Sequence, residues 1–200
     1  MYIPRQFSIT DEAEIHAFID NNGFGQLLSM VGGRLFSSHL PFLLSDCKTR
    51  LFCHLAKQNP QVSEIAGQEV LVTLQGSHDY VSPSWYETPG VPTWNYQAVH
   101  LYGNCRLISA SKELAALLDK LTMKYEAALT PPWQPDYRAT LLDAIVGLEI
   151  DITEVQCKYK LSQNRSESDQ IHVSRQLEAT GSKMLAAAMQ QQLEQLQGSK

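Results

Sequence analysis

The sequence predicts a mainly β protein with helices, an α+β fold in which an antiparallel β-barrel is followed by helices near the C-terminus. Three observations support this fold class. Six segments alternate apolar and polar residues as strands do, short turns join several of them as hairpins, and helical spacing of apolar residues is concentrated late in the chain. The expected strands cover residues 24–31, 34–44, 50–56, 69–81, a segment that begins at 93, and 148–160.

The N-terminal part predicts a helix followed by a hairpin. Asp11 can cap the helix, because Glu14 stands three residues further on and apolar residues then follow at helical spacing. Gly32 and Gly33 form a tight turn between the first two strands. Pro41 cannot donate a hydrogen bond to a neighbouring strand, so the second strand is expected to lie at an edge of the sheet or to bend at this residue.

A short helix is expected directly after the third strand. Asn59 can cap this helix and Pro60 suits its first turn, so residues 60–66 are expected to be helical and to end at Gly67. The chain then passes through the long strand 69–81 into a loop, residues 82–92, that carries three prolines. A loop of this length in a compact domain is more often functional than idle.

The strand that begins at Thr93 has aromatic rings and hydrogen-bonding groups at its entrance. In its second half, Val99 and Leu101 share one face of the strand, which leaves the alternate residues for the other face. Trp94 and Asn95 suit a planar ligand, but they are also typical of an ordinary aromatic corner. These residues alone leave both interpretations open.

The remaining helices follow from apolar spacing and from capping residues. They are expected at residues 111–129, with Ser111 as the cap, and at 136–145, 166–178 and 183–196. The last of them is rich in alanine and glutamine and has little apolar face, so we expect its end to fray.

Composition and charge restrict the classes of function. Hydrophobic residues make up 44% and charged residues 18%, which is typical of a soluble globular protein, and we expect one domain because no linker divides the chain. The formal charge of −5 gives no overall attraction to nucleic acids, and no basic patch offsets it. No signal peptide opens the sequence and no apolar stretch approaches the roughly 20 residues of a membrane span, so a cytoplasmic location with no membrane segment is expected.

The residue types that commonly carry chemistry form no familiar catalytic motif. The four cysteines lack a Cys-x-x-Cys pair, so reduced and mostly buried thiols are expected. His39, His54 and His100 lie on expected strands, but no metal-binding spacing surrounds them and no metal is expected. The serines lack a Gly-x-Ser-x-Gly motif, so catalytic residues stay unknown.

Two segments carry donors that suit an anion. His54, Lys57 and Asn59 place a positive side chain beside a helix start, where free backbone N–H groups and the helix dipole would favour a phosphate. The alternative is a solvated Lys57 next to an asparagine cap. Residues 160–165 place cations and amides in a loop that suits a phosphate or the edge of a heterocycle, or that simply forms a surface turn and a helix cap.

Five motifs together resemble the PaiB family, a group of FMN-binding split-barrel proteins labelled negative transcriptional regulators. They follow one another along the chain at residues 39–44, 54–61, 82–86, 91–96 with 99–100, and 160–165. The resemblance runs from residue 1 to about residue 177. It implies an FMN-binding split-barrel domain of the pyridoxamine phosphate oxidase-like type at residues 1–180, with a C-terminal helical extension at 181–200.

The resemblance also implies a homodimer that holds FMN in the groove between its subunits. The phosphate would be held by His54, Lys57 and Asn59. The flavin ring would lie beside Ser38, His39, Leu40 and Pro41. The same groove would be lined by Trp94 and Asn95, with Lys160 and Gln163 reaching across from the partner subunit. Gln58 and Val62 depart from the family pattern, so the wall near the phosphate is expected to differ.

The function that follows is a dimeric FMN-binding protein similar to PaiB-type regulators, acting by flavin or redox sensing or through a protein partner. The lack of a helix-turn-helix pattern and of a basic face argues against direct DNA binding. The alternatives are a flavin-dependent oxidoreductase for a small substrate, and a haem-binding split barrel in which His39 or His100 is an axial ligand.

Overall fold

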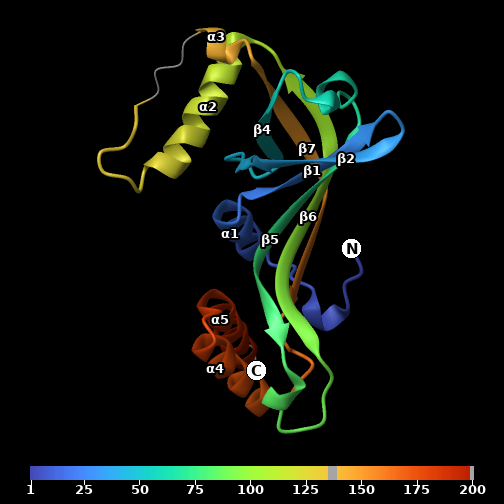
Figure 1. Cartoon of the computed structure of the whole chain (residues 1–200), viewed down its shortest axis with the longest axis vertical. Coiled ribbons are helices and arrows are strands. Elements are labelled where there is room, and N and C mark those ends of the chain that lie inside the picture. Colours follow the sequence, from blue (N-terminus) through green and yellow to red (C-terminus); the bar gives the residue numbers. More distant parts are fainter. Residues whose placement is uncertain (135–138, 199–200) are drawn as a thin grey trace. The chain divides into compact units, whose positions relative to one another are not determined.

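The computed structural model describes residues 1–134 and 139–198, and seven strands in these residues form one sheet (Figure 1). The order of the strands is β2-β1-β5-β6-β7-β4-β3. β1 pairs antiparallel with β2 and β5, and β4 pairs antiparallel with β3 and β7. The strands are β1 (Phe24–Val31), β2 (Arg34–Pro41), β3 (Leu43–Leu44), β4 (Arg50–Ala56), β5 (Glu69–Val81), β6 (Thr93–Ile108) and β7 (Ile145–Lys160). The predicted fold class is confirmed.

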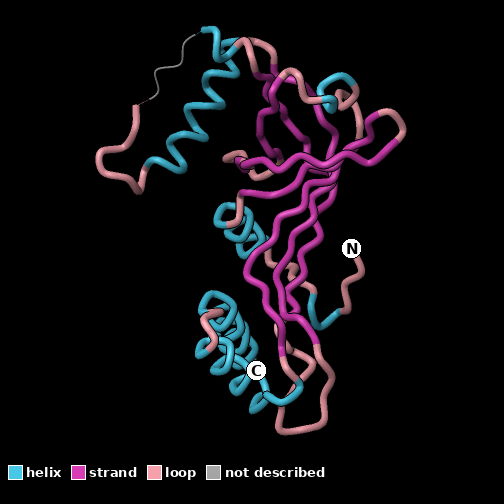
Figure 2. The backbone as a smooth tube through the Cα atoms, viewed as in Figure 1, coloured by secondary structure: helices cyan, strands magenta, loops and turns pink. Residues whose placement is uncertain are grey.

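The α-helices and strands follow one another along the chain in the predicted order (Figure 2). The α-helices are α1 (Glu12–Asn21), α2 (Ser111–Glu126), α3 (Ala139–Leu142), α4 (Glu167–Ala179) and α5 (Lys183–Gly198), and single 3₁₀ turns occur at η1 (Arg5–Phe7), η2 (Pro60–Ser63) and η3 (Pro83–Trp85). Within the described part of the chain, no helix has both the length and the apolar character that crossing a membrane requires.

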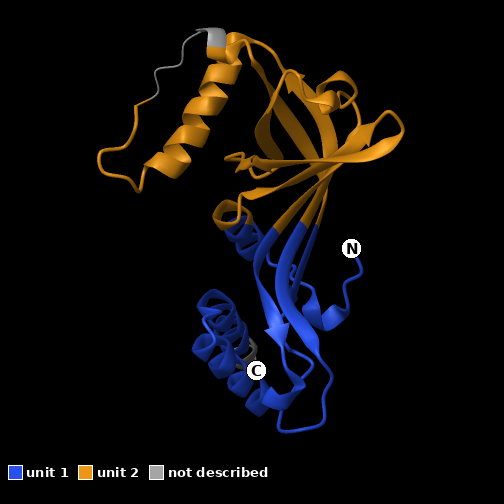
Figure 3. Cartoon of the chain, in the orientation of Figure 1, with its two compact units in different colours: residues 1–18, 75–99, 156–200 blue, residues 19–74, 100–155 orange. Residues whose placement is uncertain are grey.

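The chain divides into two compact units (Figure 3). Unit 1 comprises residues 1–18, 75–99 and 156–200, and unit 2 comprises residues 19–74 and 100–155. β5, β6 and β7 contribute residues to both units.

Unit 2 holds the hairpin β1–β2 and the strands β3 and β4. The two ends of the strand order approach each other, since β2 also contacts β4, and this is how a sheet curls into a barrel. Every second residue of β4 points inward, and these residues, Leu51, Cys53 and Leu55, are at most 2% exposed. Helix α2 covers another part of the sheet, where Gly147 leaves room: a Cβ at this position would lie 3.2 Å from Leu117.

Unit 1 is built around the helix pair α4–α5. Val173 and Leu177 of α4 are completely buried, and Leu185 and Met189 of α5 are at most 2% exposed. The Ser174 hydroxyl donates a hydrogen bond across the pair to a backbone carbonyl of α5 at 3.2 Å. The expectation that this last helix has little apolar face is therefore wrong, because alanine and methionine positions complete a buried stripe.

Several predicted boundaries need correction. The predicted strand 34–44 is two strands, because Phe42 turns into the core and donates its N–H to Gly23 instead of to a neighbouring strand. The predicted helix 60–66 is only the 3₁₀ turn η2. α2 begins after Ala110 with no side-chain cap, so Ser111 is its first residue rather than its cap, and it ends at Glu126.

Other boundaries agree with the predictions or fall outside the described residues. Asp11 caps α1, since its carboxylate accepts the Glu14 N–H at 2.8 Å. β2, which contains Pro41, lies at an edge of the sheet as predicted. The predicted helix 136–145 begins outside the described residues; α3 is its described part, and residue 145 already belongs to β7.

Candidate functional site

A hydrogen-bonded network in unit 2 fixes the turn that follows β4. The Asn59 amide donates to the Ser38 hydroxyl at 2.9 Å, and its oxygen accepts the Gln61 N–H at 2.9 Å. The Ser38 hydroxyl in turn donates to the Gln61 side-chain oxygen at 2.5 Å. Because Gln61 is completely buried and also donates to Ser29 at 2.8 Å, the network joins η2 to both strands of the hairpin. Two predicted site residues, Ser38 and Asn59, are thus brought into direct contact.

Lys57 stands at the exposed end of this turn. Its backbone N–H donates to the Ala144 carbonyl at 2.9 Å, and the Asn59 N–H donates to the Ala56 carbonyl at 2.9 Å, so the main chain around it is fixed. Among the described residues, no hydrogen bond or ion pair engages the Lys57 amine. The structure therefore presents a free ammonium group on a rigid base.

The anion-binding argument from a helix dipole does not hold here. η2 is a 3₁₀ turn of four residues, too short to build up an appreciable macrodipole, and the Asn59 side chain already occupies its first N–H group. The positive charge that this turn can offer a phosphate is that of the Lys57 side chain.

His54 lies on the face of β4 opposite to the buried row of residues. It shares this face with Arg50 and Phe52, and it pairs with Gly147 of β7. Its Nδ1 is shielded from solvent and has no hydrogen-bond partner among the described residues. Burial lowers the pKa of the imidazole, so the ring is neutral at pH 7. A buried ring nitrogen without a partner is a place where a bound group could supply one.

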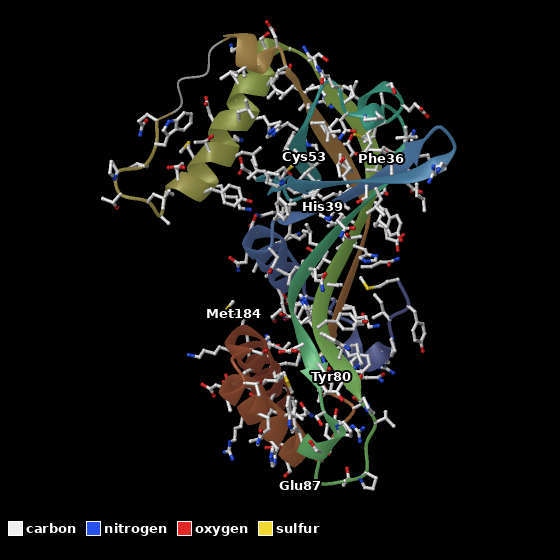
Figure 4. The ribbon with its side chains drawn as sticks, in the orientation of Figure 1. Phe36, His39, Cys53, Tyr80, Glu87 and Met184 are labelled. Atoms are coloured by element: carbon white, nitrogen blue, oxygen red, sulfur yellow. The ribbon has the colours of Figure 1, made fainter. Side chains whose placement is uncertain are left out.

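β2 presents its predicted cofactor residues on two different sides. Ser38 and Leu40 are partly buried, whereas His39 is exposed and pairs with Gln26 across the hairpin (Figure 4). Pro41 ends the strand opposite Phe24. Because side chains alternate along a strand, a flat ring that lies on one side of β2 meets either His39 or the pair Ser38 and Leu40, but not all three.

In unit 1, two of the predicted site residues use their amides within the chain. Asn95 is completely buried, where it donates to the Ser162 hydroxyl at 2.9 Å. Gln163 closes the turn after β7, accepting from the Leu161 N–H and donating to the Tyr159 carbonyl, both at 2.7 Å. Their part in cofactor binding stays a prediction, and these bonds show what a ligand would have to replace.

The other two predicted residues of unit 1 lie next to each other. The Lys160 amine donates to the Thr93 hydroxyl at 2.6 Å and to the Trp94 carbonyl at 2.5 Å. Burial lowers the pKa of Lys160, and the neighbouring positive charges of Lys158 and Arg165 lower it further. The Trp94 ring is 54% exposed and meets Tyr80 edge to face, with 6.2 Å between the ring centres.

Sequence reasoning missed a cavity of about 700 Å³ in unit 2. Its walls come from the β3–β4 hairpin and from α2, with one residue each from β6 and β7, and none of the residues predicted for the cofactor lines it. Glu149, only 6% exposed, lies at this cavity and is held by both Arg106, at 2.9 and 2.6 Å, and Arg50, at 3.2 Å. No local motif could have revealed the cavity, because its residues are far apart in sequence.

Burial alone would raise the pKa of the Glu149 carboxyl. The hydrogen bonds and positive charges of Arg106 and Arg50 outweigh that effect, so the net shift of the pKa is downward. The carboxylate is therefore ionised at neutral pH.

Comparison with solved structures shows the class of fold. The flavocytochrome Anf3 from Azotobacter vinelandii has a TM-score of 0.67 at 19% identity, covering 84% of this chain and 77% of that one. The FAD and heme binding protein from Mycobacterium smegmatis has a TM-score of 0.64 at 18% identity, covering 82% and 78%. With the antiparallel sheet described above, these likenesses show a split β-barrel fold.

Comparison with protein families identifies the family. Residues 1–154 match the family model described as "Putative FMN-binding domain". The Bacillus subtilis protein named "Protease synthase and sporulation protein PAI 2" is 39% identical over 204 residues, covering 96% of this chain and 98% of that protein. The chain belongs to the PaiB family of FMN-binding domains, and the predicted resemblance is confirmed.

Proposed function

We propose that this chain is a dimeric FMN-binding protein that acts by flavin or redox sensing or through a protein partner. The observation that carries the proposal is the turn after β4, where an unengaged Lys57 amine stands on a main chain fixed by Ser38, Asn59 and Gln61. A rigid turn with a free cation suits a phosphate monoester, because the turn is already ordered and binding costs little additional conformational entropy.

The residues of this region fit FMN. Lys57 supplies the charge for the phosphate, and His54 supplies a neutral ring whose Nδ1 has no partner among the described residues. Ser38 and Asn59 hold the turn in place. Bound FMN would contribute reversible electron transfer, and the protein would control its orientation and its access to solvent.

The proposed dimer gives a role to apolar side chains that water would otherwise contact. Phe24, Met30 and Leu35 of the β1–β2 hairpin are 63%, 41% and 77% exposed. Met30 and Leu35 are direct cross-strand neighbours, so they form one surface. A second copy of the chain that covers this surface would remove it from water and would close a groove beside β2.

A regulatory role without direct DNA binding is consistent with the charge of the chain. The net charge of −5 opposes binding to a phosphate backbone. The B. subtilis relative is named "Protease synthase and sporulation protein PAI 2", and this name supports a role in regulation.

The test compares FMN with riboflavin, which lacks the phosphate. In the Lys57→Ala variant we expect FMN to bind about 10- to 100-fold more weakly, because a charge-assisted contact is lost, and riboflavin to bind unchanged. Lys112→Ala, which removes an exposed lysine from α2, is the matched control and should bind both ligands as the original chain does. Equal FMN affinity in the Lys57 variant and the control would contradict the assignment.

A further inference from the structure

The cavity in unit 2 has a cysteine in its wall. Cys47 lies in the turn between β3 and β4, and it is exposed. Its sulfur lies 3.3 Å from the Ser45 hydroxyl and 3.1 Å from the Thr49 hydroxyl. A residue with a nucleophilic side chain therefore belongs to the lining of the cavity.

The turn that carries Cys47 is held by its own backbone. The Ser45 N–H donates to the Arg50 carbonyl at 2.8 Å, and the Arg50 N–H donates to the Ser45 hydroxyl at 3.0 Å. Lys48 has a positive φ of 63°, and its amine pairs with Asp20 at 3.1 Å. The position of the sulfur relative to the cavity is thus fixed by the hairpin.

The surroundings of Cys47 favour its thiolate. Hydrogen bonds from Ser45, then Thr49, then Arg50 lower its pKa to about 6. The other three thiols are buried, and burial raises the pKa of Cys105 and Cys157 to about 12 and that of Cys53 well above its ordinary value. Cys47 is therefore an exposed thiol with a lowered pKa, whereas the other three thiols are buried and have raised pKa values.

The cavity walls indicate what kind of molecule could reach that thiol. Most of the lining surface is apolar, and it is contributed by Leu43, Leu44, Phe52, Ile108, Ala116, Leu117 and Met123.

The charges at the cavity leave no excess that would select an anion. Three acidic residues, Asp46, Glu113 and Glu149, and two basic residues, Arg50 and Lys120, line the cavity. Asp46 pairs with Lys120 at 3.5 Å and Glu149 with Arg50 at 3.2 Å. A neutral apolar molecule suits these walls better than an ion.

We propose that this cavity binds neutral, apolar α,β-unsaturated carbonyl compounds and that Cys47 captures them covalently. The Sγ thiolate forms a bond to the β-carbon, the electron pair of the C=C bond moves to the enolate, and the enolate takes a proton from water at the α-carbon. No oxidant or reductant is needed. This inference does not depend on FMN binding, so the two can fail separately.

The test uses two enals with the same reactive group but different chain lengths, but-2-enal and 2-nonenal, with adducts measured by intact-protein and peptide mass spectrometry. We expect one adduct per chain, located at Cys47, and a rate that rises with pH around a midpoint near 6. For each thiol, we compare the rate of reaction with 2-nonenal to the rate with but-2-enal. This ratio should be about tenfold or more higher for the protein than for glutathione, because the cavity buries the longer chain.

Two variants separate the roles of the sulfur and the cavity. Cys47→Ser should give no adduct. Ala116→Trp places a large ring in the cavity from an exposed position of α2, and it should remove the preference for 2-nonenal while leaving the but-2-enal rate within about twofold. Labelling at another cysteine, or a chain-length preference equal to that of glutathione, would overturn the proposal.

Discussion

At the scale of single residues, the site depends on side chains whose partners lie far away in sequence. Gln61 is completely buried, and it donates to Ser29 and to the Leu27 carbonyl, 32 and 34 residues earlier. The Asn59 cap was predictable, because its partner is two residues away. The role of Gln61 was not, since a glutamine after a proline carries no local signal of burial.

The first prediction concerns Glu149 and acid stability. Because its pKa is lower in the folded chain than the ordinary 4.5, the carboxylate stabilises the fold above that ordinary value, and this stability is lost as the pH falls through the folded-state pKa. Glu149→Gln should destabilise the protein by about 1–3 kcal/mol at pH 7. This is less than a fully buried ion pair would contribute, because solvent screens the charges of the two half-exposed arginines. The difference should shrink as the pH falls below 4.5 and approach zero once the Glu149 carboxyl is protonated.

Urea unfolding of both proteins between pH 3 and pH 7 measures this difference. Asp46→Asn, which affects an exposed carboxylate, is the control and should change the free energy of unfolding by less than about 0.5 kcal/mol. A Glu149 effect that is the same at every pH would refute the ion-pair explanation.

At the scale of elements, regular alternation predicted the strands better than composition predicted the helices. β4 and β5 have the predicted bounds, and every second residue is buried from Leu51 to Leu55 and from Val70 to Leu74. The apolar face of α5 was underestimated, because alanine and methionine contribute little to an apolar face until a neighbouring helix packs against them. The break between β2 and β3 depends on Phe42 entering the core, which is a tertiary effect.

The second prediction tests the packing of α5 with two adjacent residues. Leu185 is 1% exposed, whereas Met184 is 79% exposed (Figure 4). Leu185→Ala should lower the free energy of unfolding by about 2–4 kcal/mol, since it leaves a cavity against α4. Met184→Ala should change it by less than about 0.5 kcal/mol. Urea denaturation followed by circular dichroism measures both, and similar values for the two variants would mean that α5 does not pack as described.

At the scale of the whole molecule, the sequence motifs led to the family and to the fold class. They could not place the cavity beside α2, because its walls come from strands and a helix whose residues are distant in sequence. Alternation along the predicted strand did place Ser38 and His39 on opposite sides of β2, although the resemblance assigns both residues to one ring-binding segment.

The third prediction concerns the proposed dimer. Leu35→Glu introduces a charge into the exposed apolar surface of the β1–β2 hairpin, and burying that charge at an interface would be costly. Light scattering after size exclusion should give a dimer mass for the original chain and a monomer mass for the variant. Met184→Glu, at an exposed position of α5, should leave the dimer intact. A Leu35→Glu protein that stays dimeric would place the interface elsewhere.

The measurement that tests the central claim most directly is the visible absorbance of the purified protein after incubation with FMN and removal of the free ligand. Our account predicts the two bands of oxidised flavin, one FMN released per chain on denaturation, and a marked loss of both in the Lys57→Ala variant. A protein that stays colourless and takes up no FMN would contradict the account.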